Sequence, residues 1–366
     1  MNYKMQDLCE ITSSRRIFAR EYKNFGIPFY RSQEVIECSL KGNTNPTIFI
    51  SEERYNEIIK SGLGIPCLGD ILMSAIGANR GYPWCVNKVP FYFKDGNVIW
   101  LRNFKPFCNS KYLTYFLSTS KCIDTIQKSS EHSAQGAITL DLIKKIQIDL
   151  PSIGKQQHIV NTIGSVDDLI ENLMQQNEIL MNLGITKINL FNDSNELKLL
   201  STIVEFEKGF EVGSSNYIEN DGVNLIQYLR VGDLLSLGNT FIDESISNKI
   251  SKIDDILVAF DGAPGRNNIG LYGAYSSGIY NLKCNNSNKG LVYFEINSDI
   301  NKKIIDDHSQ GTTILHASKS INHLVYANID DKDKELLNAY FNLLLQNKKK
   351  INSLKHIKAN LLNKYF

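Results

Sequence analysis

Two long stretches of the chain space apolar residues at alternating intervals of three and four. Such spacing lines one face of a helix with apolar side chains, against which a partner helix can pack. We call these rows the first seam and the second seam and expect helices over residues 155–191 and 334–366. The first seam consists of Ile159, Ile163, Val166, Ile170, Leu173, Asn177 and Leu180. The second consists of Leu337, Tyr340, Leu344, Asn347, Ile351, Leu354, Lys358 and Leu361.

Each seam follows a segment with a different pattern, made of short apolar runs separated by Gly, Pro and Asn. Short β-rich runs with such punctuation predict strands, and longer amphipathic runs predict helices. In the first segment we expect strands at 47–50, 71–76, 89–93 and 97–101, and helices at 110–118 and 121–128. In the second we expect strands at 255–260, 278–283 and 291–296, and a helix at 298–308.

The two segments share landmarks in the same order, which indicates an internal duplication. Asp70-Ile71-Leu72 corresponds to Asp255-Ile256-Leu257, and a Gly-containing turn with an arginine follows each. His132-Ser133-Ala134-Gln135-Gly136 likewise corresponds to His308-Ser309-Gln310-Gly311 before the seam helix. The spacing of these matches varies, so loops of different length are expected on a common frame.

The fold class expected from this pattern is α+β. Two globular domains would cover residues 1–151 and 192–331, and two helices would cover 152–191 and 332–366. The economical packing of globule, helix, globule, helix is antiparallel, with the globules related by a pseudo-two-fold axis. Asn177 and Asn347 in the seams would set the register of the helix pair, or else would face solvent.

Composition narrows the function by excluding several classes. The 366 residues carry a net charge of +1, so no global basic signature marks the chain as a nucleic-acid binder. No apolar run is long enough to span a membrane and no signal segment opens the chain, so we expect a cytoplasmic protein. The seven cysteines contain no CxxC pair and the six histidines no HxH or HxxxH pair, so no metal site is predicted.

Catalytic motifs are also missing from the sequence, which predicts a protein that is not an enzyme. We find no Asn/Asp-Pro-Pro-Tyr/Phe methyltransferase motif, no Walker A pattern and no GxGxxG. Glu21-Tyr22-Lys23 and Glu196-Leu197-Lys198 fit a nuclease-like ExK triplet, but such triplets are common by chance. No catalytic residue is therefore assigned.

A few polar residues are candidates for contact with DNA bases. Arg80 and Arg266 lie in the Gly-rich turns, and arginine to guanine is the commonest specific contact. The alternative is a surface arginine that satisfies a loop carbonyl. Arg31 and Arg230, at matched strand ends, would contact a groove or form a structural ion pair. The full candidate set is Arg16, Arg31, Asn79, Arg80, Gln135, Arg230, Arg266 and Gln310, where the two glutamines would pair with adenine or cap the coming helix.

The landmarks together resemble those of type I restriction-modification specificity subunits over nearly the whole chain. The resemblance rests on Leu8-Cys9-Glu10-Ile11, Gly26-Ile27-Pro28-Phe29-Tyr30-Arg31, Gly69-Asp70-Ile71-Leu72, Ile148-Asp149-Leu150-Pro151 and Gln156-Gln157-His158-Ile159-Val160. The second half departs from it, because Ile329-Asp330-Asp331 replaces the Leu-Pro before the helix and no Gln-Gln follows.

The resemblance implies two target-recognition domains, each specific for one half of a split, asymmetric DNA sequence. The helices would set the spacer and dock two methyltransferase subunits, and motor-nuclease subunits would join for restriction. S-adenosylmethionine and ATP would bind those partners, so this chain would carry no cofactor. The expected spacer and docking residues are Ile159, Ile163, Ile170, Leu173, Leu344, Ile351 and Leu354.

Two other functions fit the same pattern. The chain would be the specificity subunit of a related system that cuts on both sides of its site, with methylation and cleavage fused in the partner. Alternatively it would be a coiled-coil scaffold joining two protein-binding globules, without DNA binding.

Overall fold

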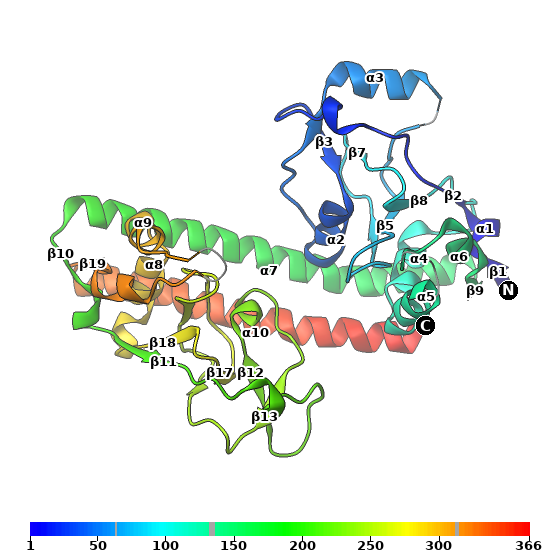
Figure 1. Ribbon diagram of the computed structural model, residues 1–366. Coiled ribbons are helices and arrows are strands. Elements are labelled where there is room, and N and C mark those ends of the chain that lie inside the picture. Colours follow the sequence, from blue (N-terminus) through cyan, green and yellow to red (C-terminus); the bar gives the residue numbers. More distant parts are fainter. Residues whose placement is uncertain (63, 132–135, 312–314) are drawn as a thin grey trace. The chain divides into compact units, whose positions relative to one another are not determined.

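The chain forms two compact units, whose boundaries differ from those of the domains expected from the sequence. The computed structural model describes residues 1–62, 64–131, 136–311 and 315–366. Unit 1 comprises Met1–Glu171 and Lys355–Phe366, and unit 2 comprises Asn172–Leu354 (Figure 1). The boundaries between the two units fall inside both long helices. The domain bounds expected from the sequence, at residues 151, 191 and 331, separate the helices from the globules. Those domain bounds stay a prediction.

Unit 1 is built around two small sheets whose central strands are buried. Trp100 and Leu101 of one sheet and Phe29 and Tyr30 of the other are at most 2% exposed. The first sheet is antiparallel, in the order β2 (Glu10–Thr12), β8 (Val98–Arg102), β5 (Ile71–Ser74) and β6 (Pro83–Cys85). The second has the order β4 (Phe49–Ile50), β3 (Ile27–Tyr30) and β7 (Tyr92–Phe93), with β3 parallel to β7. A further pair joins β1 (Asn2–Lys4) to β9 (Gln147–Asp149).

Helices cover the sheets of unit 1, and two of these helices begin at a side-chain cap. The Asn109 side chain accepts a hydrogen bond from the Tyr112 amide at the start of α4, and Ser51 does the same for Arg54 of α3. The helices are α1 (Met5–Leu8), η1 (Ala19–Glu21), α2 (Ser32–Lys41), α3 (Glu52–Lys60), α4 (Ser110–Leu117), α5 (Ser120–Glu131), α6 (Leu140–Lys145) and the first part of α7 (Ile153–Ser194).

Unit 2 repeats the strand order of unit 1, which confirms the internal duplication. Its first sheet has the order β11 (Glu205–Lys208), β18 (Ile279–Lys283), β15 (Leu257–Ala259) and β16 (Asn267–Asn268). Its second has the order β13 (Phe241–Asp243), β12 (Leu225–Leu229), β17 (Gly273–Tyr275) and β14 (Ile250–Ser251), with β12 parallel to β17 as β3 is to β7. The pair β10 (Leu197–Leu199) and β19 (Val325–Ala327) corresponds to β1 and β9.

The helices of unit 2 correct one sequence prediction. Residues 291–296, expected as a strand, belong to helix α8 (Lys289–Ile296). All residues from Gly290 to Ile296 are buried, and a helix that is buried on all sides gives no amphipathic pattern to distinguish it from a strand. The other helices are η2 (Leu200–Thr202), η3 (Ser214–Asn216), η4 (Val231–Leu234), η5 (Asn286–Asn288), α9 (Asp299–Asp307), η6 (Ser318–Asn322) and α10 (Asp331–Tyr365).

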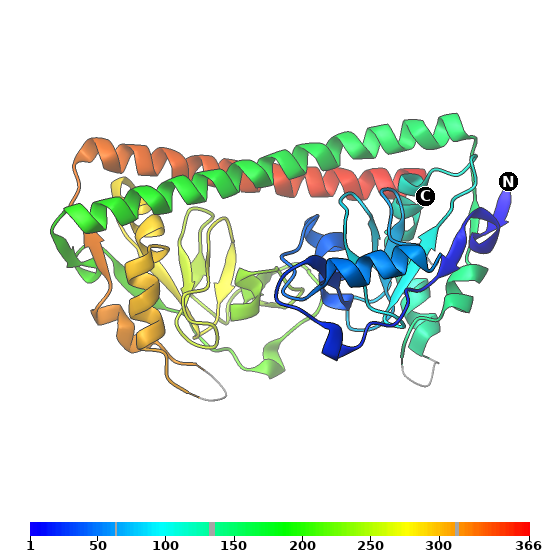
Figure 2. The same ribbon diagram turned by 90° about the horizontal axis from the view of Figure 1, so that it is seen from above.

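The two seam helices are confirmed as α7, with 42 residues, and α10, with 35. Within unit 2 the second half of α7 lies antiparallel to the first half of α10 (Figures 1 and 2). The Asn347 Nδ2 donates to Asn177 Oδ1 at 3.0 Å, and Lys187 pairs with Asp333 at 2.9 Å. Asn347 is 1% exposed, so the two seam asparagines satisfy one another inside the helix pair. Within unit 1, Lys358 of α10 pairs with Asp167 of α7 at 2.7 Å.

One side-chain amide attaches each long helix to its own globule, and of the two Gln156 is buried whereas Asn338 is partly buried. In unit 1 the Gln156 Oε1 accepts from the Asn109 amide at 2.8 Å, and its Nε2 donates to the carbonyls of Phe107 and Pro151. In unit 2 the Asn338 Oδ1 accepts from the Gly290 amide at 2.6 Å. The second half therefore lacks the Gln-Gln pair but keeps an amide anchor on its helix.

Candidate nucleic-acid interface

In unit 1 the residues predicted to contact DNA lie in the loops that follow β2, β3 and β5. β2 and β5 both run antiparallel to β8, and β3 runs parallel to β7, so the loops after these strands emerge at shared edges. The Ser14 hydroxyl donates to the Phe93 carbonyl at 2.7 Å and the Ala75 amide to the Asn97 carbonyl at 2.8 Å, which ties three of these loops together. The structure thus brings Arg16, Arg31 and the Asn79–Arg80 turn to one region.

Two arginines of this region are held by carboxylates. Arg16 follows β2 and its Nε pairs with Asp95 at 2.9 Å, with the arginine side chain 69% exposed. Arg31 directly follows β3 and its Nη2 pairs with Glu34 at 2.6 Å, while the Arg31 amide donates to the same carboxylate. The hydrogen bond that the Arg31 guanidinium donates to Glu34 raises the pKa of Arg31 above its ordinary value. Of the two, Arg16 keeps the side chain that is more open to a ligand.

The Arg80 side chain does not project freely from its turn but donates hydrogen bonds to helix α5. Its Nε donates to the Ser130 hydroxyl at 2.8 Å and its Nη2 to the Gln127 carbonyl at 3.4 Å, while Gln127 Nε2 donates to the Arg80 carbonyl. The side chain thereby fastens the 77–81 turn to α5. Asn79, next to it, is exposed. The paired candidate Gln135 lies outside the described residues.

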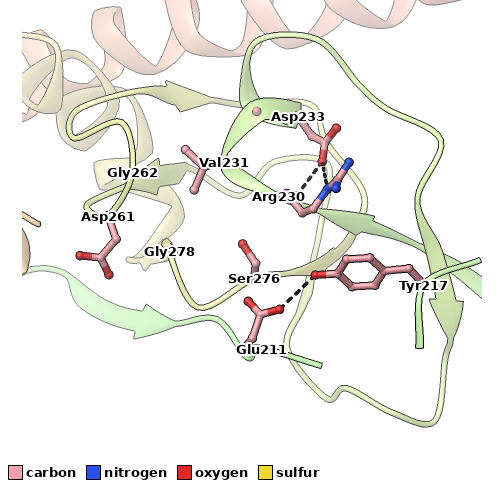
Figure 3. Close-up of a pocket in the computed structure, with 10 residues that line it drawn as sticks. Glu211, Tyr217, Arg230, Val231, Asp233, Asp261, Gly262, Ser276 and Gly278 are labelled. Atoms are coloured by element: carbon pink, nitrogen blue, oxygen red, sulfur yellow. Dashed lines mark hydrogen bonds and ion pairs between the residues drawn. The ribbon is translucent and has the colours of Figure 1, made fainter. Parts of the chain in front are cut away.

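In unit 2 the corresponding loops enclose an open surface pocket of about 480 Å³ (Figure 3). Its walls come from the ends of β11, β12, β15 and β17, which contribute Glu211, Arg230, Asp261 and Ser276. Arg230 is half-exposed, and its Nε lies 3.8 Å from the Asp233 carboxylate. Its guanidinium carbon lies 5.8 Å from the centre of the Tyr217 ring.

The remaining candidates of unit 2 lie beside this pocket. Arg266 Nη1 donates to the Val231 carbonyl at 3.3 Å, the loop-carbonyl contact that was the alternative for this residue. The Gln310 backbone pairs with His316, whose Nδ1 lies 2.8 Å from Asp261. Gln310 itself is exposed. The DNA-binding roles of all these residues remain predictions, but the structure places them around the same loops.

Matched positions in the two units carry different chemistry. Arg31 and Arg230 each precede a carboxylate by three residues, and in both the carboxylate accepts from the arginine amide. Glu34 also accepts two hydrogen bonds from the Arg31 guanidinium. The other carboxylate oxygen of Asp233 instead accepts a hydrogen bond from the Gly238 amide. Arg230 is therefore freer to leave its carboxylate than Arg31.

The seam residues proposed for spacing and docking lie mostly inside the chain. Ile159, Ile163, Leu344 and Ile351 are buried, and Ile170, Leu173 and Leu354 are partly buried. Sequence reasoning missed a second, exposed row on each helix. On α7 this row contains Leu169, Ile179, Leu183 and Leu190, and on α10 it contains Leu336, Leu343 and Ile357. Its signal is the recurrence at multiples of seven residues, as in 169, 183 and 190, or in 336, 343 and 357.

Reactive groups are scarce in the described part of the chain. Among the described residues no group of three or more His, Cys, Asp or Glu side chains is arranged to hold a metal. Burial raises the pKa of the Cys9, Cys38, Cys108 and Cys122 thiols to about 12, which keeps them protonated near neutrality. No helix of the described residues is both long and apolar enough to cross a bilayer.

Comparison with known proteins now gives the class. Residues 1–181 match the family described as the type I restriction modification DNA specificity domain. Over these residues, which make up just under half of the chain, the sequence is similar to that family. The loops around Arg16, Arg31 and Arg80 thus lie within the matched residues.

Individual relatives agree with this family. The chain is 25% identical over 173 residues to a protein of Haemophilus influenzae named as a type I restriction enzyme specificity subunit, covering 47% of this chain and 41% of that protein. It is 31% identical over 185 residues to the type I restriction enzyme MjaIX specificity subunit of Methanocaldococcus jannaschii, covering 49% of this chain and 37% of the relative. The matches thus span less than half of either curated relative.

A solved structure shares the fold over the full length. The S subunit of a type I restriction-modification system from M. genitalium aligns with 100% of this chain and 96% of its own, with a TM-score of 0.55 and 16% identity. The α+β fold with long helices is therefore that of a known S subunit.

Proposed function

We propose that this chain is the DNA-specificity subunit of a type I restriction-modification complex. It recognises a bipartite, asymmetric DNA sequence, with the domains at 1–151 and 192–331 each specific for one half. The observation that supports this most is the duplicated strand order, which places equivalent loops at equivalent strand ends in both units. Because those loops differ in residues, the two half-sites differ in sequence.

The proposed subunit is not catalytic. Methyltransferase subunits supply S-adenosylmethionine chemistry, and motor-nuclease subunits supply ATP-driven cleavage. The helices α7 and α10 set the spacer between the half-sites.

The test is a survey of modified bases in cells. Cells that express the chain with its methyltransferase partner are expected to carry methylated adenine in one bipartite motif, and cells with the partner alone are not. Long-read sequencing of genomic DNA measures this directly. If no bipartite motif depends on the chain, while the purified complex also fails to bind DNA, the coiled-coil scaffold is the correct function instead.

The methyltransferase subunits would dock on the exposed rows rather than on the seams. Leu183 and Leu190 lie one heptad apart on α7 and are 49% and 62% exposed, so an apolar helix of a partner can pack there. The seam residues behind them are already covered within the chain. This assigns spacing to the seams and docking to the rows.

Replacing Leu183 and Leu190 by glutamate is expected to abolish co-purification of the methyltransferase subunit. Two charges in an apolar interface are costly to bury without partners, whereas exposed glutamates hardly affect the free chain. Affinity purification measures the complex and thermal unfolding checks the fold. Gln176, in the same heptad column and exposed, supplies the control variant Gln176→Glu, which should leave the complex intact. Retained co-purification of the double variant would contradict docking at this row.

A further inference from the structure

In the pocket of unit 2, Tyr217 contacts both a hydrogen-bond donor, Arg230, and a hydrogen-bond acceptor, Glu211. Tyr217 donates its hydroxyl to Glu211 Oε1 at 3.0 Å, while its ring lies beside the Arg230 guanidinium (Figure 3). Ser277 Oγ lies 3.5 Å from the other Glu211 oxygen. The exposed Glu211 carboxylate therefore retains capacity to accept a strong hydrogen bond from a ligand.

The charges around the pocket argue against a phosphate ligand. Glu211, Asp233 and Asp261 all line it, and carboxylates repel a phosphodiester. Asp261 pairs with His316, and Asp233 accepts hydrogen bonds from two backbone amides. Glu211 is exposed, and its close hydrogen-bond donor is the Tyr217 hydroxyl. Of the three carboxylates, Glu211 is therefore the one best able to accept a hydrogen bond from a ligand. On DNA, the groups that a carboxylate can face favourably in the major groove are the exocyclic amines of the bases.

We infer that this pocket recognises a G·C base pair in the half-site of unit 2, with Arg230 on guanine and Glu211 on the cytosine amine. Guanine presents two acceptors in the major groove, N7 and O6, and its partner cytosine presents the N4 donor beside them. An arginine and a glutamate that both contact one tyrosine of the same pocket complement that edge. Tyr217 acts as a positioning residue, since its hydroxyl holds the acceptor and its ring lies beside the donor. The inference rests on the proposed function.

Unit 1 does not repeat this constellation in its equivalent loop. The segment between β2 and β3 contains Arg15, Arg16, Arg20 and Lys23, and its one acidic residue, Glu21, pairs with Arg54 at 2.7 Å. The segment between β11 and β12 contains Glu211, Glu219 and Asp221 and no lysine or arginine. The base recognition assigned to Glu211 is therefore specific to the half-site of unit 2.

The test uses the full complex of this chain with its methyltransferase partner and duplexes carrying the motif found in the cellular survey. Each base pair of the motif is changed in turn, and binding is measured for the chain with Glu211→Ala, Arg230→Ala or Tyr217→Phe. We expect Glu211→Ala and Arg230→Ala to reduce discrimination at one and the same G·C pair by roughly ten- to hundredfold. Tyr217→Phe keeps the ring and removes the hydroxyl, so it should reduce discrimination at that pair less. The other half-site should be unaffected by all three.

Glu219→Ala is the matched control, because Glu219 is an exposed acid of the same segment outside the pocket. It should leave discrimination unchanged at every position. The inference is overturned if Glu211→Ala and Arg230→Ala act at different base pairs, or if neither changes discrimination while the bipartite motif persists. The absence of any motif that depends on the chain would instead refute the proposed function.

Discussion

Replacing Gly290 by alanine is expected to destabilise the protein by about 2–4 kcal/mol, at or beyond the upper part of the range for overpacking. Gly290 is the second residue of α8, where that helix approaches α10. A Cβ atom there would lie 2.3 Å from the Leu337 carbonyl carbon and 2.4 Å from the Asn338 nitrogen. These are backbone atoms, which cannot rotate away as a side chain does. Any shift of α8 also breaks the 2.6 Å hydrogen bond from the Gly290 amide to the Asn338 anchor.

Gly164→Ala in α7 supplies a control with the opposite sign. A Cβ at Gly164 would meet Lys111 Nζ at 3.5 Å and Tyr115 Oη at 3.6 Å, which are ordinary contacts. Because alanine favours a helix interior over glycine, this variant should gain up to about 1 kcal/mol. Urea unfolding of the purified chain, followed by circular dichroism, measures both. Equal effects of the two substitutions would show that the close contact of α8 with α10 is not the cause.

Inserting one heptad into both long helices is expected to lengthen the DNA spacer without changing either half-site. Seven helical residues add about 10 Å, which is close to the length of three base pairs. The insertions would follow Glu171 in α7 and Leu354 in α10, where the compact units divide. A whole heptad keeps the seam positions in phase, so the Asn177–Asn347 pair and the amide anchors remain.

Sequencing of the methylated motif measures the spacer in cells that carry the lengthened chain. A heptad inserted in α7 alone is the control, because it shifts the two seams against one another and should abolish methylation rather than lengthen the spacer. An unchanged spacer in the doubly lengthened chain would contradict the role of the helices as spacers. Altered bases in either half-site would show that the helices also take part in recognition.

Periodic features were the part of the fold that the sequence predicted well. The seams predicted α7 and α10, because apolar residues that recur at intervals of three and four over many turns fit a helix and not a strand. The asparagine pair was one of two options left open, and the structure selects it, with Asn347 bonded to Asn177. The duplication was visible from landmarks such as Asp70 and Asp255, which occupy equivalent loops before β5 and β15.

Non-local contacts were the part that the sequence could not predict. Residues 291–296 are apolar except for Glu295 and show no helical periodicity, so the helix is evident only from their burial and from the close approach of α8 to α10. The same holds for the candidate interface. Arg80 donates to Ser130, which lies fifty residues further along the chain. Arg31 and Arg230 differ in how firmly their side chains are held. The second carboxylate oxygen of Glu34 accepts from the arginine side chain, whereas that of Asp233 accepts from a backbone amide. Glu211 and Tyr217 carried no signal in the sequence, because their relation appears only when the β11–β12 segment is placed beside Arg230.

The composition of unit 1 has a consequence for the order in which the protein matures on the ribosome. Its core includes Leu361, Leu362, Tyr365 and Phe366, and the Phe366 ring lies 5.0 Å from that of Tyr112. These residues are synthesised only after all of unit 2, whose segment Asn172–Leu354 is continuous. During translation unit 2 can close first, while unit 1 waits with Tyr112 and Phe116 uncovered. We therefore expect the nascent chain to expose an apolar surface while more than half of its sequence is made, and to need shielding of that surface until α10 is complete.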